Sequence, residues 1–368
     1  MPTALRLVIA GGGTGGHLFP GIAIAQEFMQ RNAENRVLFI GTGKPFEKQA
    51  LSKMGYCHHK ITVEGFKGRG ILKQLLALFK IPQGLFQSVG ILNRFKPHLI
   101  LGVGSYAAGP VILGGWLLGI KSALHEQNLL PGITNRILAP VVRRIYISFQ
   151  DTQSKFNLQK VRYTGNPIRK EILNRAGSTQ AKACCDSDHR FTVLIVGGSQ
   201  GAHSINETMI EALRHIKNPD NFFFIHQTGS TDEQLVKDAY HDFGLAYAAK
   251  PFFDNIDHQY LKADLIIARA GATTVAETTA LGKGVVFIPY PFAADNHQVL
   301  NARALAEKGA AEMIHQAELN GQLLAERIEY YASHPEAIQQ MALKAKRFGK
   351  PDASKTIVDD LYRLATTG

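Results

Sequence analysis

The sequence predicts an α/β protein with two Rossmann-like, doubly wound domains, and three observations lead to this fold class. Short apolar runs of β-type residues alternate with segments of helical period along the whole chain. Such alternation is typical of parallel sheets covered by helices on both faces. A polar stretch without period, residues 174–190, interrupts it, and we expect the interdomain linker in or just before this stretch. Both halves open with a strand that runs into a glycine-rich turn.

Each predicted strand is a short apolar run, and helical periods fill most of the gaps between the strands. Examples of the helical pattern are Pro20–Gln30 and Pro131–Leu138, and the last helix, Asp352–Ala365, follows Pro351. We expect strands at Leu5–Ala10, Arg36–Ile40, His58–Val63, His98–Val103, Ser122–His125 and Arg144–Ile147, and then at Thr192–Val196, Phe222–His226, Ala246–Ala249, Asp264–Ala268, Val285–Ile288 and Ala311–Ile314.

Composition limits the class of protein. The chain is 45% hydrophobic and 19% charged, which is typical of a globular enzyme. Cys57, Cys184 and Cys185 show no regular spacing, which argues against a disulfide framework or a zinc site and favours a reducing compartment. The first residues carry no secretory signal. The uncharged stretch Leu99–Ile120 is long enough to cross a bilayer, but its glycines and Pro110 favour a strand, a loop and a short helix.

The net charge of +11 indicates an anionic partner. Phosphorylated substrates and an anionic membrane surface both fit this charge. Nucleic acid is the least favoured partner, because the sequence has no zinc finger, no RNA-binding aromatic signature and no long basic helix.

The first glycine-rich turn, Gly11–His17 (GGGTGGH), directly follows the first strand. Glycines let backbone N–H groups approach an anion, and the helix that follows directs its positive end to the same place. A nicotinamide dinucleotide site would also need an acid at the tip of the second strand, where the sequence has Ile40–Lys44 (IGTGK). This makes a nicotinamide cofactor a minor alternative, beside a turn that serves packing alone.

Two further glycine-rich segments, Gly102–Pro110 (GVGSYAAGP) and Gly197–Ala202 (GGSQGA), also follow predicted strands. The carboxyl ends of parallel strands are where open α/β sheets bind ligands. Several such turns in two domains suggest a donor and an acceptor that both carry phosphates.

A polar cluster follows two strands of the second half. Residues Ala272–Thr274 are expected to begin a helix whose N-terminus suits a diphosphate. Glu277, one turn later, can accept hydrogen bonds from both hydroxyls of a ribose, or can simply favour the helix dipole. Asp295–Gln298 and Asn301 offer hydrogen bonds suited to a sugar, although a solvated surface explains them equally well.

Seven motifs stand in one order along the chain: GGGTGGH, GVGSYAAGP, HEQN, GNPIR, GGSQGA, RAGATTVAE and DNHQ. In this combination the chain resembles, over almost its whole length, the MurG family of bacterial lipid I N-acetylglucosaminyltransferases of peptidoglycan synthesis. The resemblance implies the glycosyltransferase-B architecture, in which two Rossmann-like domains face a cleft. Residues 1–165 would face the acceptor and the membrane, residues 166–349 would bind the UDP-sugar, and the helix within 350–368 would pack back on the first domain.

The resemblance also implies the reaction. N-acetylglucosamine would pass from UDP-GlcNAc to the 4-hydroxyl of MurNAc in undecaprenyl-diphospho-MurNAc-pentapeptide, converting lipid I to lipid II with inversion. The alternative is another UDP-sugar enzyme on the same fold, an epimerase or a glycolipid synthase. No cofactor is implied. The Asp186–Asp188 match to an Asp-x-Asp metal motif lies in the polar linker, and we therefore expect no essential metal.

Site residues are assigned by matching motifs. His17 is the first candidate for the general base, with binding of the acceptor or capping of the helix as the other interpretation, and Glu126 is a supporting catalytic group. Ser105 stands where the family usually has glycine. The acceptor would contact Gly13, Ser105, Tyr106 and His125. The donor site would comprise Thr14, Gly15, Gly16, Asn128, Arg169, Ser199, Phe253, Ala272, Thr273, Thr274, Val275, Ala276, Glu277 and Gln298.

Within the donor site the resemblance implies separate roles. Glu277 would bind the ribose and Gln298 the sugar hydroxyls. Ala272, Thr273 and Ser199 would lie near the diphosphate. Arg169 would meet the charge of the leaving group or form a plain salt bridge, and Phe253 would pack on the uracil.

The segment Lys60–Lys96 mixes cations, among them Lys67, Arg69, Lys73 and Lys80, with apolar residues. This pattern suits peripheral contact with an anionic leaflet, here the cytoplasmic face of the inner membrane. The competing interpretation is a helix that buries its leucines in the core.

Overall fold

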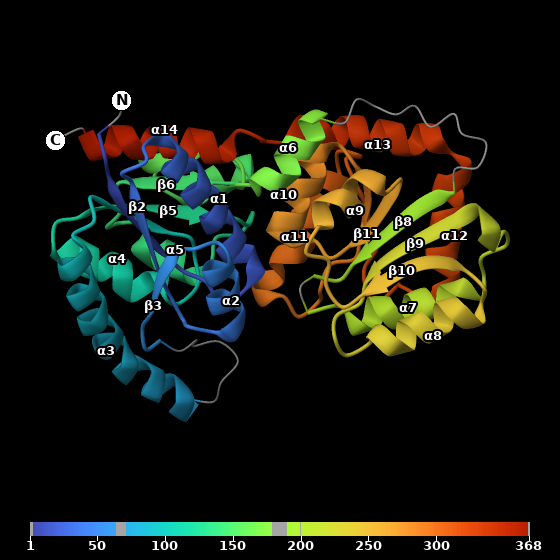
Figure 1. Cartoon of the computed structure of the whole chain (residues 1–368), viewed down its shortest axis with the longest axis horizontal. Helices are drawn as coiled ribbons and strands as arrows, with labels where there is room; N and C mark the ends of the chain where they lie inside the picture. Colours follow the sequence, from blue (N-terminus) through green and yellow to red (C-terminus); the bar gives the residue numbers. More distant parts are fainter. Residues whose placement is uncertain (1–2, 64–70, 179–189, 199, 367–368) are drawn as a thin grey trace. The chain divides into compact units, whose positions relative to one another are not determined.

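The computed structural model describes residues 3–63, 71–178, 190–198 and 200–366. The chain divides into two compact units, of which unit 1 comprises residues 1–169 and 351–368 and unit 2 comprises residues 170–350 (Figure 1). Each unit holds one parallel sheet with helices on both faces. The predicted α/β class with two doubly wound domains is therefore confirmed.

Unit 1 is built on a parallel sheet with the strand order β3-β2-β1-β4-β5-β6-β7. Neighbouring residues of β1 point to opposite faces, so that Leu7 and Ile9 join one core cluster and Val8 and Ala10 the other. The sequence missed β7, whose short run carries no clear apolar signal, and placed the end of β3 too late. The strands are β1 Arg6–Ala10, β2 Arg36–Gly41, β3 Cys57–Lys60, β4 Leu99–Gly102, β5 Lys121–Glu126, β6 Arg144–Ile147 and β7 Val161–Tyr163.

The C-terminal helix α14, Ala353–Thr366, belongs to unit 1 and packs against α1 (Figure 1). The ring of Tyr362 lies 5.6 Å from that of Phe28 in a tilted arrangement, and its hydroxyl lies 2.6 Å from the side-chain nitrogen of Asn35. Asp360 accepts a hydrogen bond of 3.0 Å from Tyr146 of β6. The other helices of the unit are α1 Gly15–Arg31, α2 Pro45–Lys53, α3 Ile71–Phe95, α4 Ala108–Leu117, α5 Ile133–Leu138 and the short 3-10 helices Gln150–Lys155 and Leu158–Lys160.

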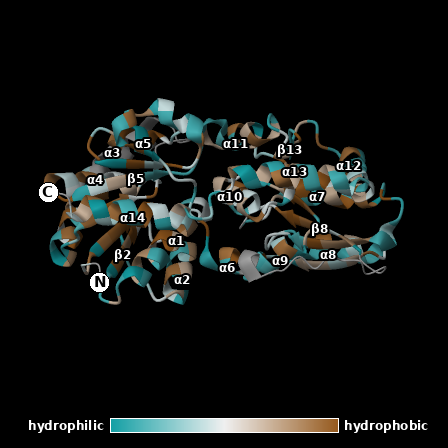
Figure 2. Cartoon of the chain, turned by 90° about the horizontal axis from the view of Figure 1, so that it is seen from above, coloured by the Kyte–Doolittle hydropathy of each residue, from teal (hydrophilic) through white to brown (hydrophobic). Residues whose placement is uncertain are grey.

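Unit 2 repeats the plan with the strand order β10-β9-β8-β11-β12-β13. All strands predicted for this half are present, and none of their ends differs from the prediction by more than one residue. Figure 2 shows the hydrophobic colour concentrated on strands such as β8. The strands are β8 Phe191–Val196, β9 Phe222–Gln227, β10 Ala246–Lys250, β11 Leu265–Ala268, β12 Gly284–Phe287 and β13 Glu312–Met313.

The helices of unit 2 cover both faces of this sheet. Among the residues that the structure describes, no helix of either unit is long and apolar enough to cross a membrane. The helices of unit 2 are α6 Lys170–Ser178, α7 His203–Leu213, α8 Glu233–Asp242, α9 Ile256–Lys262, α10 Ala272–Leu281, α11 His297–Ala306, α12 Gly321–Ser333 and α13 Pro335–Phe348, with 3-10 turns at Pro219–Asn221 and Ala294–Asn296.

In both sheets the strand order reverses beside the first strand of the unit, between β1 and β4 and between β8 and β11. Loops that leave a sheet at such a switch point diverge to opposite faces and leave room for a ligand. The glycine-rich turns of the sequence lie at these two places.

Candidate active site

Two glycine-rich loops touch at the switch point of unit 1. Gly11 has a φ of +144°, and a Cβ atom there would lie 2.5 Å from the carbonyl oxygen of Gly104. Only glycine allows this approach, because any side chain would force the two backbones apart. The turn after β1 and the turn after β4 therefore form one surface.

Glu47, from the first turn of α2, braces the first glycine-rich turn and was missed by the sequence analysis. Its buried carboxylate accepts hydrogen bonds from the backbone N–H of Gly13, from the Thr42 hydroxyl at 2.7 Å and from the Gly43 N–H at 2.9 Å. The Gly13 N–H therefore donates to Glu47, and the assignment of Gly13 to the acceptor stays a prediction. The amides of Gly15 and Gly16 remain as the helix N-terminal donors.

His17 lies in the first turn of α1 and faces the second loop. Its Nδ1 atom is 3.2 Å from Oε1 of Gln127, and a Cβ atom on Gly104 would lie 2.7 Å from the same nitrogen. Position 104 must therefore be glycine for the imidazole to occupy this place.

His125 and Glu126 lie deeper than expected, at the end of β5. His125 is completely buried, and burial lowers its pKa to about 3, so that the ring is neutral. Its assignment as an acceptor-binding residue stays a prediction.

The Glu126 carboxylate accepts hydrogen bonds from the N–H groups of Asn128 and Gly132, both at 3.0 Å, and from Asn135 at 2.8 Å. Burial raises the pKa of Glu126, although these bonds oppose the rise. These donors come from the loop after β5 and from α5, so Glu126 joins the two and holds Asn128 in place. Its catalytic role stays a prediction.

Ser105 adopts a φ of +67°, a left-handed conformation that favours glycine. Its hydroxyl accepts a hydrogen bond of 3.3 Å from the Ala107 N–H, and Tyr106 beside it is half-buried. The loop thus keeps a glycine-like backbone despite the serine. Arg169, at the end of unit 1, stacks its guanidinium 4.7 Å from the centre of the Phe19 ring.

In unit 2, helix α10 begins at Ala272 after Gly271, and its first turn contains no acid. The first amides of a helix have no partner within it and favour an anion. Among the described residues the Thr273 hydroxyl is buried without a hydrogen-bond partner. Glu277, one turn on, is buried and accepts a hydrogen bond of 3.1 Å from Tyr260.

The glycine-rich turn after β8 also depends on close backbone contact. A Cβ atom on Gly201 would lie 2.1 Å from the carbonyl oxygen of Thr228. Gln227 links this turn to the loop after β10: its amide nitrogen donates to Gly198 at 2.9 Å, and its oxygen accepts from the Phe253 N–H at 3.1 Å. Phe253 itself is buried. Ser199 lies outside the described residues.

Gln298 and Asn301, on α11, differ in how deeply their side chains are buried. The oxygen of Gln298 accepts a hydrogen bond of 2.9 Å from the Tyr290 N–H, and the side chain is half-buried. Asn301 is fully buried and donates to the carbonyl oxygen of Ala270 at 3.3 Å. Asn301 therefore supports the loop before α10, and Gln298 is the better placed of the two to reach a sugar.

Arg269, the first residue after β11, contacts the loops after β12 and β13 and the first turn of α7, and the sequence analysis missed it. Its guanidinium donates to the carbonyl oxygens of Ile288 and Pro289 at 3.0 and 3.2 Å, and to the side-chain oxygens of Ser204 and Gln316 at 2.8 and 2.7 Å. Burial lowers the pKa of Arg269 to about 10, which still leaves it charged at neutral pH. In the described part of the chain its hydrogen-bond partners are all neutral, so a positive charge remains at this edge.

His203, at the start of α7, forms an ion pair with Asp232. The hydrogen bond to Asp232, whose carboxylate lies 3.0 Å from Nδ1, and its negative charge raise the pKa of His203. Burial alone would raise the pKa of Asp232, but hydrogen bonds from Asn206 and His203 bring it below its usual value.

We expect the pair to stabilise unit 2 only in a limited pH window. The contribution of His203 is complete below its unfolded pKa of about 6.5 and is lost as the pH rises through its raised folded pKa. Replacing His203 by glutamine should therefore lower the free energy of unfolding more at about pH 5.5 than at about pH 9. Urea unfolding at both pH values measures this difference. The matched control is His241→Gln, an exposed histidine of α8, and an equal loss at both pH values would contradict the ion pair.

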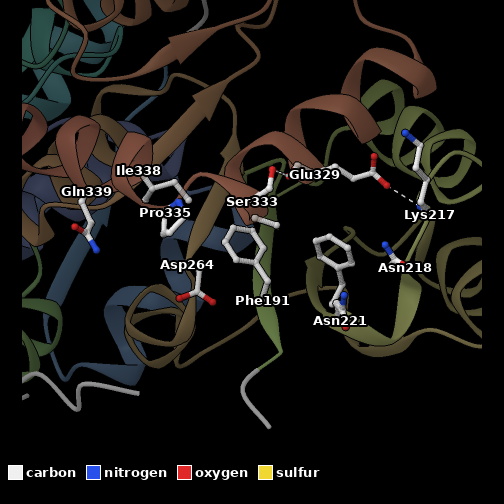
Figure 3. Close-up of a pocket in the computed structure, with 12 residues that line it drawn as sticks. Phe191, Lys217, Asn218, Asn221, Asp264, Glu329, Ser333, Pro335, Ile338 and Gln339 are labelled. Atoms are coloured by element: carbon white, nitrogen blue, oxygen red, sulfur yellow. Dashed lines mark hydrogen bonds between the residues drawn. The ribbon is translucent and has the colours of Figure 1, made fainter. Parts of the chain in front are cut away.

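A cavity of about 710 Å³ lies elsewhere in unit 2 (Figure 3). It is lined by Phe191 and Phe222, where β8 and β9 begin, and by Asp264, just before β11. Glu329 crosses one end and accepts a hydrogen bond of 2.6 Å from the backbone N–H of Lys217. The cavity is at the amino ends of the strands, opposite to the glycine-rich turns, and takes no part in the candidate site.

Comparison with known proteins identifies the family. Residues 7–147 match the glycosyltransferase family 28 N-terminal domain, and residues 192–357 match the C-terminal domain of the same family. The chain belongs to glycosyltransferase family 28. The two matched segments contain both switch points described above.

Named relatives agree with this family 28 assignment and confirm the resemblance to the MurG family. The UDP-N-acetylglucosamine–N-acetylmuramyl-(pentapeptide) pyrophosphoryl-undecaprenol N-acetylglucosamine transferase of Syntrophus aciditrophicus is 44% identical over 98% of this chain and 99% of its own length. The transferase of the same name from Myxococcus xanthus is 43% identical over 96% and 92%. The crystal structure of MurG from Acinetobacter baumannii has a TM-score of 0.78 and 30% identity, and the match covers 98% of this chain and 99% of that one.

Proposed function

We propose that this family 28 enzyme transfers N-acetylglucosamine from UDP-GlcNAc to the 4-hydroxyl of MurNAc in undecaprenyl-diphospho-MurNAc-pentapeptide, with inversion. The carrying observation is the identity of 43–44% over nearly the full length to transferases named for this donor and this acceptor. The helix N-termini and glycine-rich turns at both switch points suit two ligands that each carry a diphosphate.

Unit 2 binds the donor. The first amides of α10 hold the diphosphate of UDP. The Thr273 hydroxyl lies in the first turn of this helix, and the buried charge of Arg269 lies in the loop just before it. Glu277 accepts hydrogen bonds from the ribose hydroxyls, and the amide group of Gln298 reaches the sugar hydroxyls. Phe253 packs on the uracil, and Ala272, Thr274, Val275 and Ala276 complete this segment.

Unit 1 binds the acceptor and supplies the base. The loop with Ser105 and Tyr106 contacts the acceptor, the Gly15 and Gly16 amides contribute to the donor site, and His17 takes the proton of the acceptor hydroxyl as its oxygen attacks the anomeric carbon. The bond from that carbon to the UDP oxygen breaks in the same step. Positive potential from helix N-termini and arginine stabilises the departing UDP, so we expect no essential metal.

Release of UDP tests this function. Protein, UDP-GlcNAc and a soluble lipid I analogue, with EDTA present, should give UDP and the disaccharide product in equal amounts. Without the acceptor no UDP should form. Conversion of UDP-GlcNAc without an acceptor would favour the alternative, an epimerase. Binding of UDP-GlcNAc with no product in either mixture would reject a transferase that uses this acceptor.

Replacing Glu277 by alanine is expected to weaken UDP-GlcNAc binding by about 2 kcal/mol, roughly thirtyfold, because hydrogen bonds from the ribose to a buried carboxylate are lost. Calorimetric titration with UDP and with 2′,3′-dideoxy-UDP measures the role of the ribose directly. The variant should bind the two nucleotides equally, whereas the parent enzyme should prefer UDP.

The matched control for Glu277 is Tyr260→Phe, which removes only the hydroxyl that donates to Glu277. It should keep the preference for UDP. A Glu277→Ala variant that still prefers UDP would show that this carboxylate only favours the helix dipole.

The acceptor carries a lipid, and we propose that unit 1 rests on the anionic cytoplasmic face of the inner membrane. Helices α3 and α4 pack together, since a Cβ atom on Gly114 would lie 3.3 Å from Val89. On this pair of helices Phe86 is 77% exposed, Trp116 54% and Leu117 60%. Exposed apolar side chains beside a basic segment suit a bilayer interface. Of the expected cations, Lys67 and Arg69 lie outside the described residues.

Replacing Phe86, Trp116 and Leu117 together by serine is expected to reduce binding to phosphatidylglycerol vesicles at least about tenfold, because their apolar area no longer enters the interface. Sedimentation with vesicles measures this. Leu343→Ser is the control, because this residue of α13 in unit 2 is 65% exposed. Equal binding of the triple variant and the control would reject this surface. Loss of binding to pure phosphatidylcholine vesicles as well as to anionic ones would assign the contact to apolar insertion alone.

A further inference from the structure

Gln127 occupies the centre of a buried hydrogen-bond chain behind His17. It follows β5 and is only 1% exposed. Its amide nitrogen lies 2.8 Å from the carbonyl oxygen of Val103 and 3.1 Å from Nδ1 of His125, and its oxygen lies 3.2 Å from Nδ1 of His17. Gln127 thus contacts the loop after β4, a buried histidine and the candidate base at once.

The chemistry of these partners fixes the orientation of the amide. A backbone carbonyl oxygen can only accept a hydrogen bond, so the atom of Gln127 next to Val103 must be the nitrogen. The oxygen of the same amide must then face His17, and this oxygen can only accept. The Nδ1 atom of His17 must therefore carry the proton.

The other end of the chain agrees with this order. The second hydrogen of the Gln127 amide points to Nδ1 of His125, which must accept it and therefore carries no proton. The proton of the neutral His125 ring is then on Nε2, which faces the carbonyl oxygen of Gly165 at 3.4 Å. With this placement of protons, every donor in the hydrogen-bond series from His17 through Gln127 to His125 faces an acceptor.

We infer that Gln127 is a positioning residue that holds His17 as the Nδ1–H tautomer and so places the basic lone pair on Nε2. A histidine serves as a general base only through the nitrogen that carries the lone pair, and the partner of the other nitrogen decides which one that is. The assigned tautomer stands on the hydrogen bonds alone, whereas its importance for turnover rests on the proposed function of His17.

The first test is spectroscopic and needs no change to the chain of contacts. Nitrogen-15 NMR of the whole protein with labelled histidine distinguishes a protonated from an unprotonated ring nitrogen, and His17→Gln identifies the His17 signals by their loss. We expect Nδ1 protonated and Nε2 unprotonated in the neutral ring. The opposite tautomer in the parent protein would overturn the inference.

The second test is kinetic. Gln127→Met keeps the length of the side chain but lacks the amide oxygen that accepts the hydrogen bond from His17, so we expect kcat to fall at least about tenfold while both KM values change less than about threefold. The His17 signals should shift toward the Nε2–H tautomer. Ser148→Ala is the matched control. The Ser148 hydroxyl donates to the backbone carbonyl oxygen of Glu126 at 2.8 Å and lies 3.4 Å from Nε2 of His125, but its hydrogen bonds do not involve Gln127.

The two hypotheses can fail separately. In a His17→Ala background, Gln127→Met should cause no further loss of kcat, because the two residues act through one group. A full additional loss would overturn the positioning role. High activity of His17→Ala itself would reject His17 as the base, while the NMR measurement would still decide the tautomer.

Discussion

Replacing His17 by alanine is expected to lower kcat about a thousandfold, because a positioned general base contributes roughly 10²- to 10⁴-fold. The attacking hydroxyl would have to lose its proton to water. The dissociation constant for UDP-GlcNAc should stay within about threefold of the parent value, because the donor groups in unit 2 are unchanged. Single-turnover measurement of UDP release, together with calorimetric titration of the donor, measures the two quantities.

The His17 prediction separates the two interpretations of this residue. A base gives a loss in kcat, whereas a residue that only binds the acceptor gives a rise in the KM of the acceptor with kcat unchanged. Glu126→Gln is the comparison, because it keeps the shape of the side chain that holds Asn128. A larger loss of kcat in Glu126→Gln than in His17→Ala would make Glu126 the base.

Replacing Arg269 by methionine is expected to have the second largest effect. It should weaken UDP-GlcNAc binding about a hundredfold and lower the free energy of unfolding by about 3 kcal/mol. The change removes a buried charge next to the start of α10, and it leaves the carbonyl oxygens of Ile288 and Pro289 without their donor. Titration with the donor and urea unfolding report the two effects separately.

The control for Arg269 is lysine, which keeps the charge but loses the planar fork that reaches several loops at once. We expect Arg269→Lys to recover part of the donor affinity and little of the stability. If Arg269→Met loses stability but binds the donor normally, the residue is a clamp between loops and has no electrostatic role toward the diphosphate.

The sequence predicts the fold and the places of the ligand-binding turns, because apolar period and glycine-rich turns are local signals. The residues that it missed act over long separations. Glu47 bonds Gly13 from 34 positions away, and Gln127 contacts His17 from 110. Nothing in the local pattern around Glu47 or Gln127 indicates such a partner.

Burial was the other property that the sequence could not supply. His125 and Asn301 are polar residues in motif-rich segments, and both are completely buried. From the sequence, a polar side chain in such a segment is predicted to contact a ligand. In the structure its hydrogen-bond partners are other groups of the protein. For His125 and Asn301 the motif therefore indicates residues that hold a loop in place through buried hydrogen bonds.

The return of the C-terminal helix to the first unit affects the order in which the chain can fold during synthesis. Ile357, Val358 and Leu361 of α14 complete the same apolar cluster as Leu7 and Ile9 of β1. The ribosome therefore makes all of residues 170–350, a continuous unit, before the last part of the N-terminal core emerges. Unit 2 can therefore reach its native state first, while the core of unit 1 stays incomplete until α14 has been made.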